Sequence, residues 1–415
     1  MLAFYIENDL KLRHLRQCPI GRHLDGFADW LRVAGYKQRP AQQTLRGAAH
    51  LGHWASAHGV PTERVDDAVS DAFARHLPSC TCPHAFQGRD RYHATGARRF
   101  IQYLRTVGII ASVAVEPEPV VPLLKRFSVW MRQHRGVTES TLAHYLPLLQ
   151  EFLAALGDDA AGYDASRVRD FIFARASRHR HARAKSVVNA VRMFLRFLAV
   201  YGYVSPNLVA AVPTIAEWKL ASLPRYLVAE DIERLIAVFD PRSASGARDR
   251  AVVVLLVRLG LRAGDVRDLH LADIDWSQGL VRVVGKGRCE TWLPLPQDAG
   301  DAVLHYLEYF RPRIDDEHLF LRLYAPSGPL PSSGPISKLV RRAIQRAGIK
   351  APSMGAHVLR HSAATALLRE GASLDTIGTI LRHRCVESTA HYAKVDDALL
   401  RGITQAWPTD GEPSC

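Results

Sequence analysis

The sequence predicts a mainly α-helical, multidomain protein: helical N-terminal and core-binding domains, followed by a mixed, mostly helical catalytic domain with a small antiparallel β-sheet. Three observations support this fold class. The chain has 415 residues, more than one ordinary hydrophobic core holds. Large apolar residues recur at helical spacing through its first half. Near its middle, two β-rich runs flank Gly285-Lys-Gly-Arg288, a pattern typical of a hairpin.

Two Pro-rich stretches divide the chain. They are Val113–Pro122 and Pro206–Pro224. Proline lacks an amide donor and clashes with the preceding helical turn, so neither stretch is expected to be helix interior. We therefore expect an N-terminal helical domain over 1–115, a helical domain over 120–210, the mixed domain over 222–405 and a tail over 406–415.

The two helical domains resemble one another in sequence. Residues 27–32 read Phe-Ala-Asp-Trp-Leu-Arg and 127–132 read Phe-Ser-Val-Trp-Met-Arg, while 97–108 parallel 191–202. Each spacing places large apolar groups on one helical face and is followed by a glycine that ends the helix. The pattern favours a duplicated design, with chance similarity between amphipathic helices as the alternative.

The second helical domain carries a dense basic run. Thr138-Glu-Ser resembles the start of a helix, because a Thr or Ser side chain can cap a helix N-terminus. A run from Arg178 to Lys185 then precedes a helix expected over Val187–Val200. Cations at a loop–helix junction can hold phosphates without reading sequence. The candidate contacts are Arg178, Arg180, Arg183 and Lys185, and the alternative is a solvated basic loop.

The third domain is expected to be helical except for the hairpin. Its strands are predicted over Gly279–Gly285 and Cys289–Leu295. Helices are expected over Leu227–Phe239, Ala247–Leu259, 297–310, 334–347, 356–370, 374–382 and 387–394, of which the second is apolar enough to be buried.

The overall charge suggests a polyanionic partner. The formal net charge is +13, with 47% hydrophobic and 23% charged residues. Cationic faces attract nucleic acid and release its counterions, although extra Lys and Arg can also simply solvate helices. Six cysteines do not make a disulfide scaffold, and neither a signal peptide nor a membrane span is evident. We expect a cytoplasmic protein with no membrane partner.

Groups suited to phosphate chemistry gather in the third domain. His357, Arg360 and His361 fall at i, i+3 and i+4 on one helical face. Arg360 can bind two phosphate oxygens, and His357 can donate to phosphate or take a proton. His361 is equally consistent with a satisfied core residue. Arg262 follows Gly260 at a tight turn, where it would be held ready to bind phosphate.

Two further groups complete this candidate site. Lys286 would stand at the hairpin tip beside Arg288, and Tyr392 follows His383 by nine residues. A free phenol has a pKa of about 10, and nearby guanidinium groups would favour the phenolate. A tyrosine near activating His and Arg groups is an arrangement for nucleophilic attack, although a lone tyrosine is more often packing. Asp265 would support Arg262 or cap the following helix.

These motifs in this order resemble the tyrosine recombinase, or phage integrase, family over residues 225–400. The resemblance implies that Arg262 and Arg360 clamp the scissile phosphate and that Lys286 protonates the 5′ oxygen. It also implies roles for His357 in proton transfer, for His383 in binding a phosphate oxygen and for Tyr392 in forming a 3′-phosphotyrosine. The motifs are Gly260-Leu-Arg262, Gly285-Lys286-Gly, His357-x-x-Arg360, His383 and Tyr392.

The same resemblance implies partners and a mode of action. The 120–210 segment is similar to that family's DNA-clamping core-binding domain, with Arg288 as a further DNA contact. The implied partner is double-stranded DNA with inverted-repeat core sites, bound by a homodimer at each site and a homotetramer in synapsis. No metal or nucleotide cofactor is implied. The implied biology is DNA integration, transposition or another DNA recombination, with a phage, a transposon and dimer resolution as the alternative roles.

Two positions depart from the family pattern. Arg382 stands where glycine is common, and Asp265 stands where glutamate is usual. Neither change removes a catalytic group. A type IB topoisomerase, which shares the chemistry without strand exchange, is the nearest alternative. A DNA-binding architectural protein with a lost active site is a second alternative, but no catalytic residue is missing.

A short cysteine motif lies outside this scheme. Cys80-Thr-Cys82-Pro-His84, with His93 beyond it, suggests zinc, but the spacing is not Cys-x₂-Cys and no second cysteine pair follows. We expect an ordinary loop here and no metal.

Overall fold

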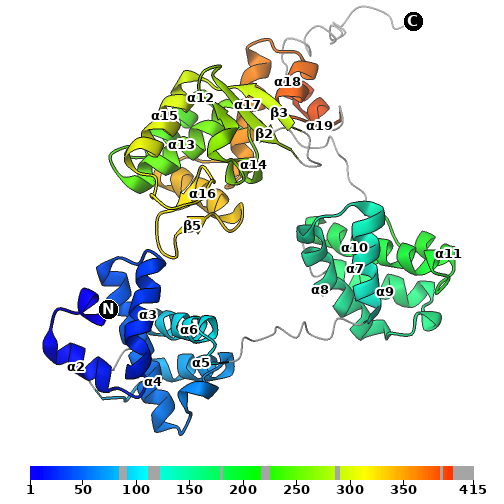
Figure 1. Ribbon diagram of the computed structural model, residues 1–415. Coiled ribbons are helices and arrows are strands. Elements are labelled where there is room, and N and C mark those ends of the chain that lie inside the picture. The colour runs from blue at the N-terminus through cyan, green and yellow to red at the C-terminus, as the bar shows by residue number, and fades with distance from the viewer. Residues whose placement is uncertain are drawn as a thin grey trace, which may run out of the picture. The chain divides into compact units, whose positions relative to one another are not determined.

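The computed structural model describes residues 1–83, 91–110, 122–177, 181–215, 225–285, 290–383 and 387–395 (Figure 1). By internal contacts the chain divides into Ala111–Lys219 and a unit made of Met1–Ile110 and Leu220–Cys415. Separate hydrophobic clusters form within residues 2–110, 124–212 and 227–359. Helices dominate and the sheets are small and antiparallel, which confirms the predicted fold class. The domain limits expected from the sequence stay a prediction.

Residues 1–110 form a helical domain around Phe27, Phe73 and Phe100, which are fully buried. Helices α4 and α6 approach closely at two glycines. A Cβ at Gly47 would lie 3.0 Å from the Cα of Gly96, so a side chain there would push the helices apart. The elements are α1 (Leu2–Tyr5), α2 (Asp9–Gln17), α3 (Gly21–Val33), α4 (Gln38–Ala57), η1 (Thr62–Arg64), α5 (Asp67–His76), η2 (Leu77–Ser79) and α6 (Arg91–Thr106).

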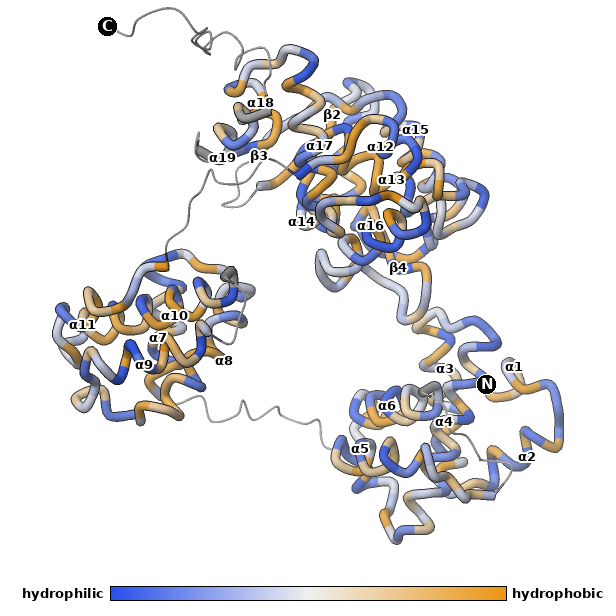
Figure 2. The backbone as a smooth tube through the Cα atoms, turned by 180° about the vertical axis from the view of Figure 1, so that it is seen from behind, coloured by the Kyte–Doolittle hydropathy of each residue, from blue (hydrophilic) through white to orange (hydrophobic). Residues whose placement is uncertain are grey.

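Residues 122–215 form a second helical domain, whose helices α7 and α10 mix hydrophobic and hydrophilic stretches (Figure 2). Its basic run lies differently from the prediction. Helix α10 begins at His181, six residues earlier than expected, so Arg183 and Lys185 lie in its first turns and not in a loop. Arg178 and Arg180 fall outside the described residues. The elements are α7 (Pro122–Arg135), α8 (Glu139–Leu156), η3 (Ala160–Gly162), α9 (Ala165–Ala176), α10 (His181–Val200) and α11 (Pro206–Ala210).

Two expectations about helix starts in this domain need correction. Helix α8 follows Thr138 as predicted, but the Thr138 side chain makes no capping hydrogen bond to the backbone. Pro206 starts the short helix α11, where a missing amide costs nothing because the first helical amides have no partner within the helix. The stretch was expected not to be helix interior, and the correction is that its first residues, Pro206–Ala210, form a helix with the proline at its start.

The aromatic clusters of the two helical domains match position by position. In each, a Phe and a Trp three residues later stack, and the Phe meets the edge of another Phe from the last long helix. The centroid distances are 5.9 Å for Phe27–Trp30 and 5.2 Å for Phe27–Phe100, against 6.4 Å for Phe127–Trp130 and 5.5 Å for Phe127–Phe194. Matching sequence and matching packing together favour duplication over chance.

The third domain is built around the apolar helix α13, whose residues Ala251 to Val257 are all buried. The predicted helices are present within a few residues of their expected ends. The helices are α12 (Ala229–Ala237), α13 (Ala244–Arg258), α14 (Ala263–Arg267), η4 (Leu271–Asp273), α15 (Gln297–Tyr309), α16 (Gly334–Arg346), α17 (Ala356–Arg369), α18 (Leu374–Ile380), α19 (Glu387–Ala390) and η5 (His391–Val395).

The predicted hairpin is also present. Strand β2 (Leu280–Val284) pairs antiparallel with β3 (Glu290–Pro294), and β1 (Ile274–Asp275) pairs with the other edge of β2. A second two-stranded sheet, β4 (Leu321–Arg322) with β5 (Gly328–Pro329), was not expected. Lys286 and Arg288 lie between β2 and β3, outside the described residues. Throughout the described parts of the chain, no helix is both long and apolar enough to cross a membrane.

Candidate active site

Gly260 makes the turn that sets up the site. The residue has a φ of 58°, a conformation that glycine adopts without a steric cost. A Cβ at this position would also lie 2.5 Å from Cδ2 of Leu381, so the two segments can approach only because the side chain is absent. The turn leads directly from α13 to Arg262, the residue before α14.

Asp265 fixes the backbone after this turn. Its Oδ2 accepts a hydrogen bond of 3.0 Å from the Arg262 amide, which caps α14. The same oxygen lies 4.0 Å from Nη1 of Arg262 and 2.5 Å from Nη2 of Arg382. Asp265 therefore caps the helix, which is one of the two roles expected for it. The guanidinium group closest to its carboxylate is that of Arg382, not that of Arg262.

Arg360 is a buried cation held by backbone carbonyls. Its side chain extends from α17, the residue is 3% exposed, and Nη1 donates to the Gly260 carbonyl at 2.6 Å while Nη2 donates to the Leu381 carbonyl. Burial, followed by the charges of Arg262 and Arg382, lowers the Arg360 pKa to about 10. Within the described residues no carboxylate pairs with this guanidinium. A buried charge without a counterion favours binding of an anion.

Arg382 is the unexpected member of the site. It has a φ of 55°, the conformation for which glycine is usual, so the glycine common at this position in the family has a backbone reason. The Arg382 side chain, 8% exposed, pairs with Asp265, and its Nε and Nη1 have no partner in the described chain. Its carbonyl accepts a 3.4 Å bond from Arg262. Arg382 thus adds a third guanidinium group beside Arg262 and Arg360.

We expect Arg382→Gly to be more stable than Arg382→Ala. Both variants lose the ion pair with Asp265, but only alanine keeps a Cβ in the left-handed conformation, which costs about 1–2 kcal/mol. Urea unfolding of the two full-length variants measures this difference in the free energy of unfolding. Equal stabilities, or a more stable alanine variant, would show that the backbone at 382 carries no such cost.

Tyr392 lies in a small apolar cluster. It is 2% exposed in η5 and packs with Ala364, Leu368, Ile377 and Leu381. Burial raises the Tyr392 pKa to about 12, and the opposing effect of Arg360 is smaller. Arg360 does favour the phenolate, as expected, but desolvation of the phenol outweighs its charge, so the net shift of the Tyr392 pKa is towards the neutral hydroxyl.

The Tyr392 hydroxyl faces a histidine instead. Its oxygen lies 2.8 Å from Nδ1 of His361 on α17. Burial lowers the His361 pKa to about 4, with smaller contributions from His357, His391 and other cationic groups. At neutral pH both partners are uncharged, so the phenol donates a hydrogen bond to Nδ1 when Nε2 carries the ring hydrogen. The same contact gives a core histidine its hydrogen-bond partner, so it is consistent with both interpretations of His361.

The remaining histidines are positioned by short contacts. His383 has its amide bonded to the Gly378 carbonyl at 2.9 Å and its Nδ1 2.7 Å from Oγ1 of Thr389. Burial, followed by Arg360 and Arg262, lowers the His383 pKa to about 4. His357 is more exposed and meets His361 edge-on, with 4.4 Å between ring centroids.

Five of the six predicted catalytic residues thus fall in one connected region. Arg262 and Arg360 bond to the neighbouring carbonyls of Arg382 and Leu381, and the rings of His383 and Tyr392 are parallel at 6.4 Å. The sixth, Lys286, is outside the described residues. Sequence reasoning assigned no function to Arg382, His361 or Thr389. The signal for Arg382 was an arginine at a position where glycine is common. The signal for His361 was its place one residue after Arg360.

Comparison with known proteins identifies this arrangement. Residues 225–398 match the model of the phage integrase family. The putative integrase/recombinase y4rA of Sinorhizobium fredii is 34% identical over 99% of this chain and 100% of its own length. Tyrosine recombinase XerC of Oceanobacillus iheyensis is 29% identical over 66% of this chain and 92% of its own.

Solved structures agree with the fold. A lambda integrase dimer bound to a COC′ core site aligns with a TM-score of 0.53 and 19% identity, over 70% of this chain and 98% of that one. A post-cleavage complex of XerH recombinase with its difH substrate aligns with a TM-score of 0.53 and 18% identity, over 82% of this chain and 95% of that one. With a relative matched along its whole length and the motifs gathered in one site, the chain belongs to the phage integrase family of tyrosine recombinases.

Proposed function

We propose that this protein is a site-specific DNA recombinase that cleaves and rejoins DNA through Tyr392. The Tyr392 oxygen attacks the scissile phosphorus, and the bond to the 5′ oxygen breaks. The products are a 3′-phosphotyrosine and a free 5′-hydroxyl. A 5′-hydroxyl from the partner duplex then attacks the same phosphorus and releases the tyrosine. Because the phosphotyrosine conserves the energy of the original bond, neither a nucleotide nor a catalytic metal is needed.

The observation that carries this proposal is the buried guanidinium of Arg360 beside Arg262, with which no carboxylate of the described residues pairs. Two guanidinium groups can bind the non-bridging oxygens and stabilise the charge of the pentacoordinate transition state. Arg360 is held by the Gly260 and Leu381 carbonyls before any substrate arrives, so little reorganisation is required. Lys286 is the proposed acid for the 5′ oxygen, and His357 and His383 are proposed to assist at the phosphate.

His361 is proposed to position the nucleophile and to accept its proton. The 2.8 Å contact between Nδ1 and the Tyr392 oxygen gives that proton a direct route. In this chain the pKa values of about 12 for Tyr392 and about 4 for His361 keep the proton on the phenol. Cleavage therefore requires the phenol proton to leave as the new bond to phosphorus forms, while the arginines stabilise the charge that develops on the phosphate oxygens.

His361→Phe is expected to slow single-turnover cleavage by about 10²-fold, the lower end of a general-base contribution. Phenylalanine keeps the packing but removes the acceptor for the Tyr392 hydroxyl. His361→Asn retains an acceptor near the position of Nδ1 and separates the two roles. Recovery of the rate in His361→Asn would assign His361 to positioning, and a loss equal to that of His361→Phe would assign it to proton transfer. Wild-type rates in both variants would contradict either role.

DNA recognition is proposed to involve both helical domains. Arg183 is exposed near the start of α10, with Lys185 two residues on, where the helix N-terminus itself favours an anion. Together with Arg178, Arg180 and Arg288, they are the proposed phosphate contacts. The matching aromatic clusters support a second clamp of the same design in residues 1–115.

We further propose that the DNA carries inverted-repeat core sites. A dimer would bind each site, and a tetramer would form in synapsis. The basis for this assembly is lambda integrase, which has been seen as a dimer on a core site and as a tetramer on a Holliday junction.

The test of this function begins with finding the DNA. Duplexes bound by the full-length protein are selected from a randomised pool, and the recovered site is synthesised with a nick just 3′ of the cleavage position. The short 5′-hydroxyl fragment then diffuses away and traps the intermediate. We expect a protein–DNA complex stable to detergent, with the nucleotide remnant located on the Tyr392 peptide by mass spectrometry. A remnant on another residue, or no complex on a tightly bound site, would overturn the proposal.

The same protein distinguishes recombination from topoisomerase activity. A plasmid with two copies of the selected site should give deletion or inversion products, while a supercoiled plasmid without the site should remain supercoiled. Relaxation of the site-free plasmid without any exchange between sites would favour the type IB topoisomerase. Tight binding with neither reaction would favour an architectural protein.

A further inference from the structure

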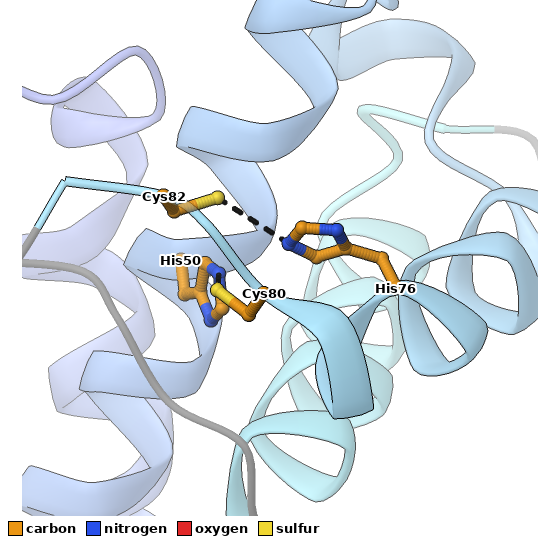
Figure 3. A group of neighbouring side chains, drawn as sticks. All are labelled: His50, His76, Cys80 and Cys82. Carbon is orange, nitrogen blue, oxygen red and sulfur yellow. Dashed lines mark hydrogen bonds between the residues drawn. The ribbon is translucent and has the colours of Figure 1, made fainter.

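Two histidines and two cysteines converge in residues 1–110, away from the catalytic residues in sequence (Figure 3). His50 comes from the middle of α4, His76 ends α5, and Cys80 and Cys82 follow η2. Their four ligand atoms all lie within 4.8 Å of one another. Cys80 Sγ is 3.4 Å from Nε2 of His50, and Cys82 Sγ is 3.4 Å from Nε2 of His76.

We propose that His50, His76, Cys80 and Cys82 bind one structural zinc ion. A tetrahedral zinc has Zn–S bonds of about 2.3 Å and Zn–N bonds of about 2.0–2.1 Å, which place neighbouring donor atoms about 3.3–3.8 Å apart. The two sulfur–nitrogen contacts of 3.4 Å already fall in this range. The widest pair, at up to 4.8 Å, needs to close by about 1.0–1.5 Å, a movement that side-chain torsions can supply.

The donor set and its burial favour zinc over other ions. Two thiolates would neutralise the charge of a divalent cation, which matters because His50 and Cys80 are both 0% exposed. Two sulfurs with two imidazoles suit zinc, whereas calcium and magnesium prefer oxygen. The four protein ligands leave no open position, so the ion would stabilise structure and take no part in chemistry.

His93 supplies the support that a metal-binding histidine usually has. Its Nδ1 lies 3.0 Å from Nδ1 of His50, the nitrogen opposite the one that faces Cys80. A hydrogen bond there would fix the ring of His50 and leave Nε2 free to bind the ion. His93 thus acts on a ligand and is not one of the four. His84, the other histidine of the sequence motif, lies outside the described residues.

The sequence predicted an ordinary loop here because the four proposed ligands are not adjacent in the chain. The pattern His76-x₃-Cys80-x-Cys82 has no Cys-x₂-Cys pair, and His50 comes from a helix 26 residues before His76. Only the packing of α4 against α5 brings the fourth ligand to the cysteines. A bound ion would link these two helices to the segment that carries Cys80 and Cys82. Cys18, which lies in the same domain, is not part of the cluster.

The metal content of the full-length protein tests the proposal. Protein purified without chelator from zinc-supplemented cells should contain one zinc per chain by elemental analysis. Cys82→Ser, at a half-buried ligand, and Cys80→Ser should lose it, while the matched variant Cys18→Ser should keep it. Tyr392→Phe should also keep its zinc, so failure of this site and failure of the recombinase mechanism are distinguishable.

Cobalt provides a readout that does not depend on variants folding. Protein stripped with a chelator and reloaded with Co²⁺ should show the visible bands of a tetrahedral site and a thiolate-to-cobalt charge-transfer band. Removal of zinc should lower the thermal midpoint and readdition should restore it. Folded wild-type protein that binds neither ion at equimolar concentration, that carries a different metal, or that has a Cys80–Cys82 disulfide in place of the ion would overturn the proposal.

Discussion

Replacement of Tyr392 by phenylalanine should abolish the covalent protein–DNA complex and leave DNA binding unchanged. The substitution removes the one oxygen that forms the new bond to phosphorus, so no residual cleavage is expected. The ring itself stays among the apolar residues Ala364, Leu368, Ile377 and Leu381. The lost hydrogen bond to His361 costs about 1 kcal/mol, a small part of the stability of a domain.

The comparison variant for this experiment is Tyr306→Phe. Tyr306 is also buried in the third domain, and its hydroxyl accepts a hydrogen bond from the Leu321 amide at 3.3 Å. Its loss removes a buried tyrosine oxygen of similar environment without touching the phosphate site. Full complex formation by Tyr306→Phe and none by Tyr392→Phe, on the nicked substrate, is the expected pair of results. A detergent-stable complex of Tyr392→Phe would show that another residue is the nucleophile.

The sequence was informative about the third domain because its signals are local. Helix periodicity, the apolar run of α13 and the glycines around the hairpin each depend on residues a few positions apart, and these elements appear where they were expected. The ordered motifs then located the catalytic residues. The short sheet formed by β4 and β5 gave no such signal, since each strand has only two residues.

The contacts between the motifs could not be predicted from the sequence. The Gly260 carbonyl binds Arg360, a residue 100 positions later, and Asp265 pairs with Arg382, 117 positions later. The net shift of the Tyr392 pKa could not be predicted either, because the extent of burial decides between charge and desolvation and is not visible in the sequence. At the start of α10 the basic run suggested a loop, yet the helix includes Arg183 and Lys185.

Arg360→Met is expected to slow cleavage by about 10²–10³-fold, the loss typical of removing one preorganised donor to a transition-state charge. Methionine fills much of the space of the arginine side chain but can neither donate to phosphate nor carry charge. Arg369→Met is the matched control, because Arg369 lies on the same helix α17 and is exposed, where it stacks on Tyr226. Single-turnover rates on the selected site, with binding saturated, measure both variants.

The Arg360→Lys variant decides whether charge alone is enough. A lysine ammonium keeps a positive charge, but it cannot bond to the Gly260 and Leu381 carbonyls and also present two parallel donors to phosphate. We therefore expect Arg360→Lys to remain closer to Arg360→Met than to the wild type in cleavage rate, while DNA affinity stays near that of the wild type. A lysine variant with wild-type rates would mean that the fixed geometry of the buried guanidinium is not what the reaction uses. Wild-type rates in Arg360→Met would remove the main support for phosphate cleavage at this site.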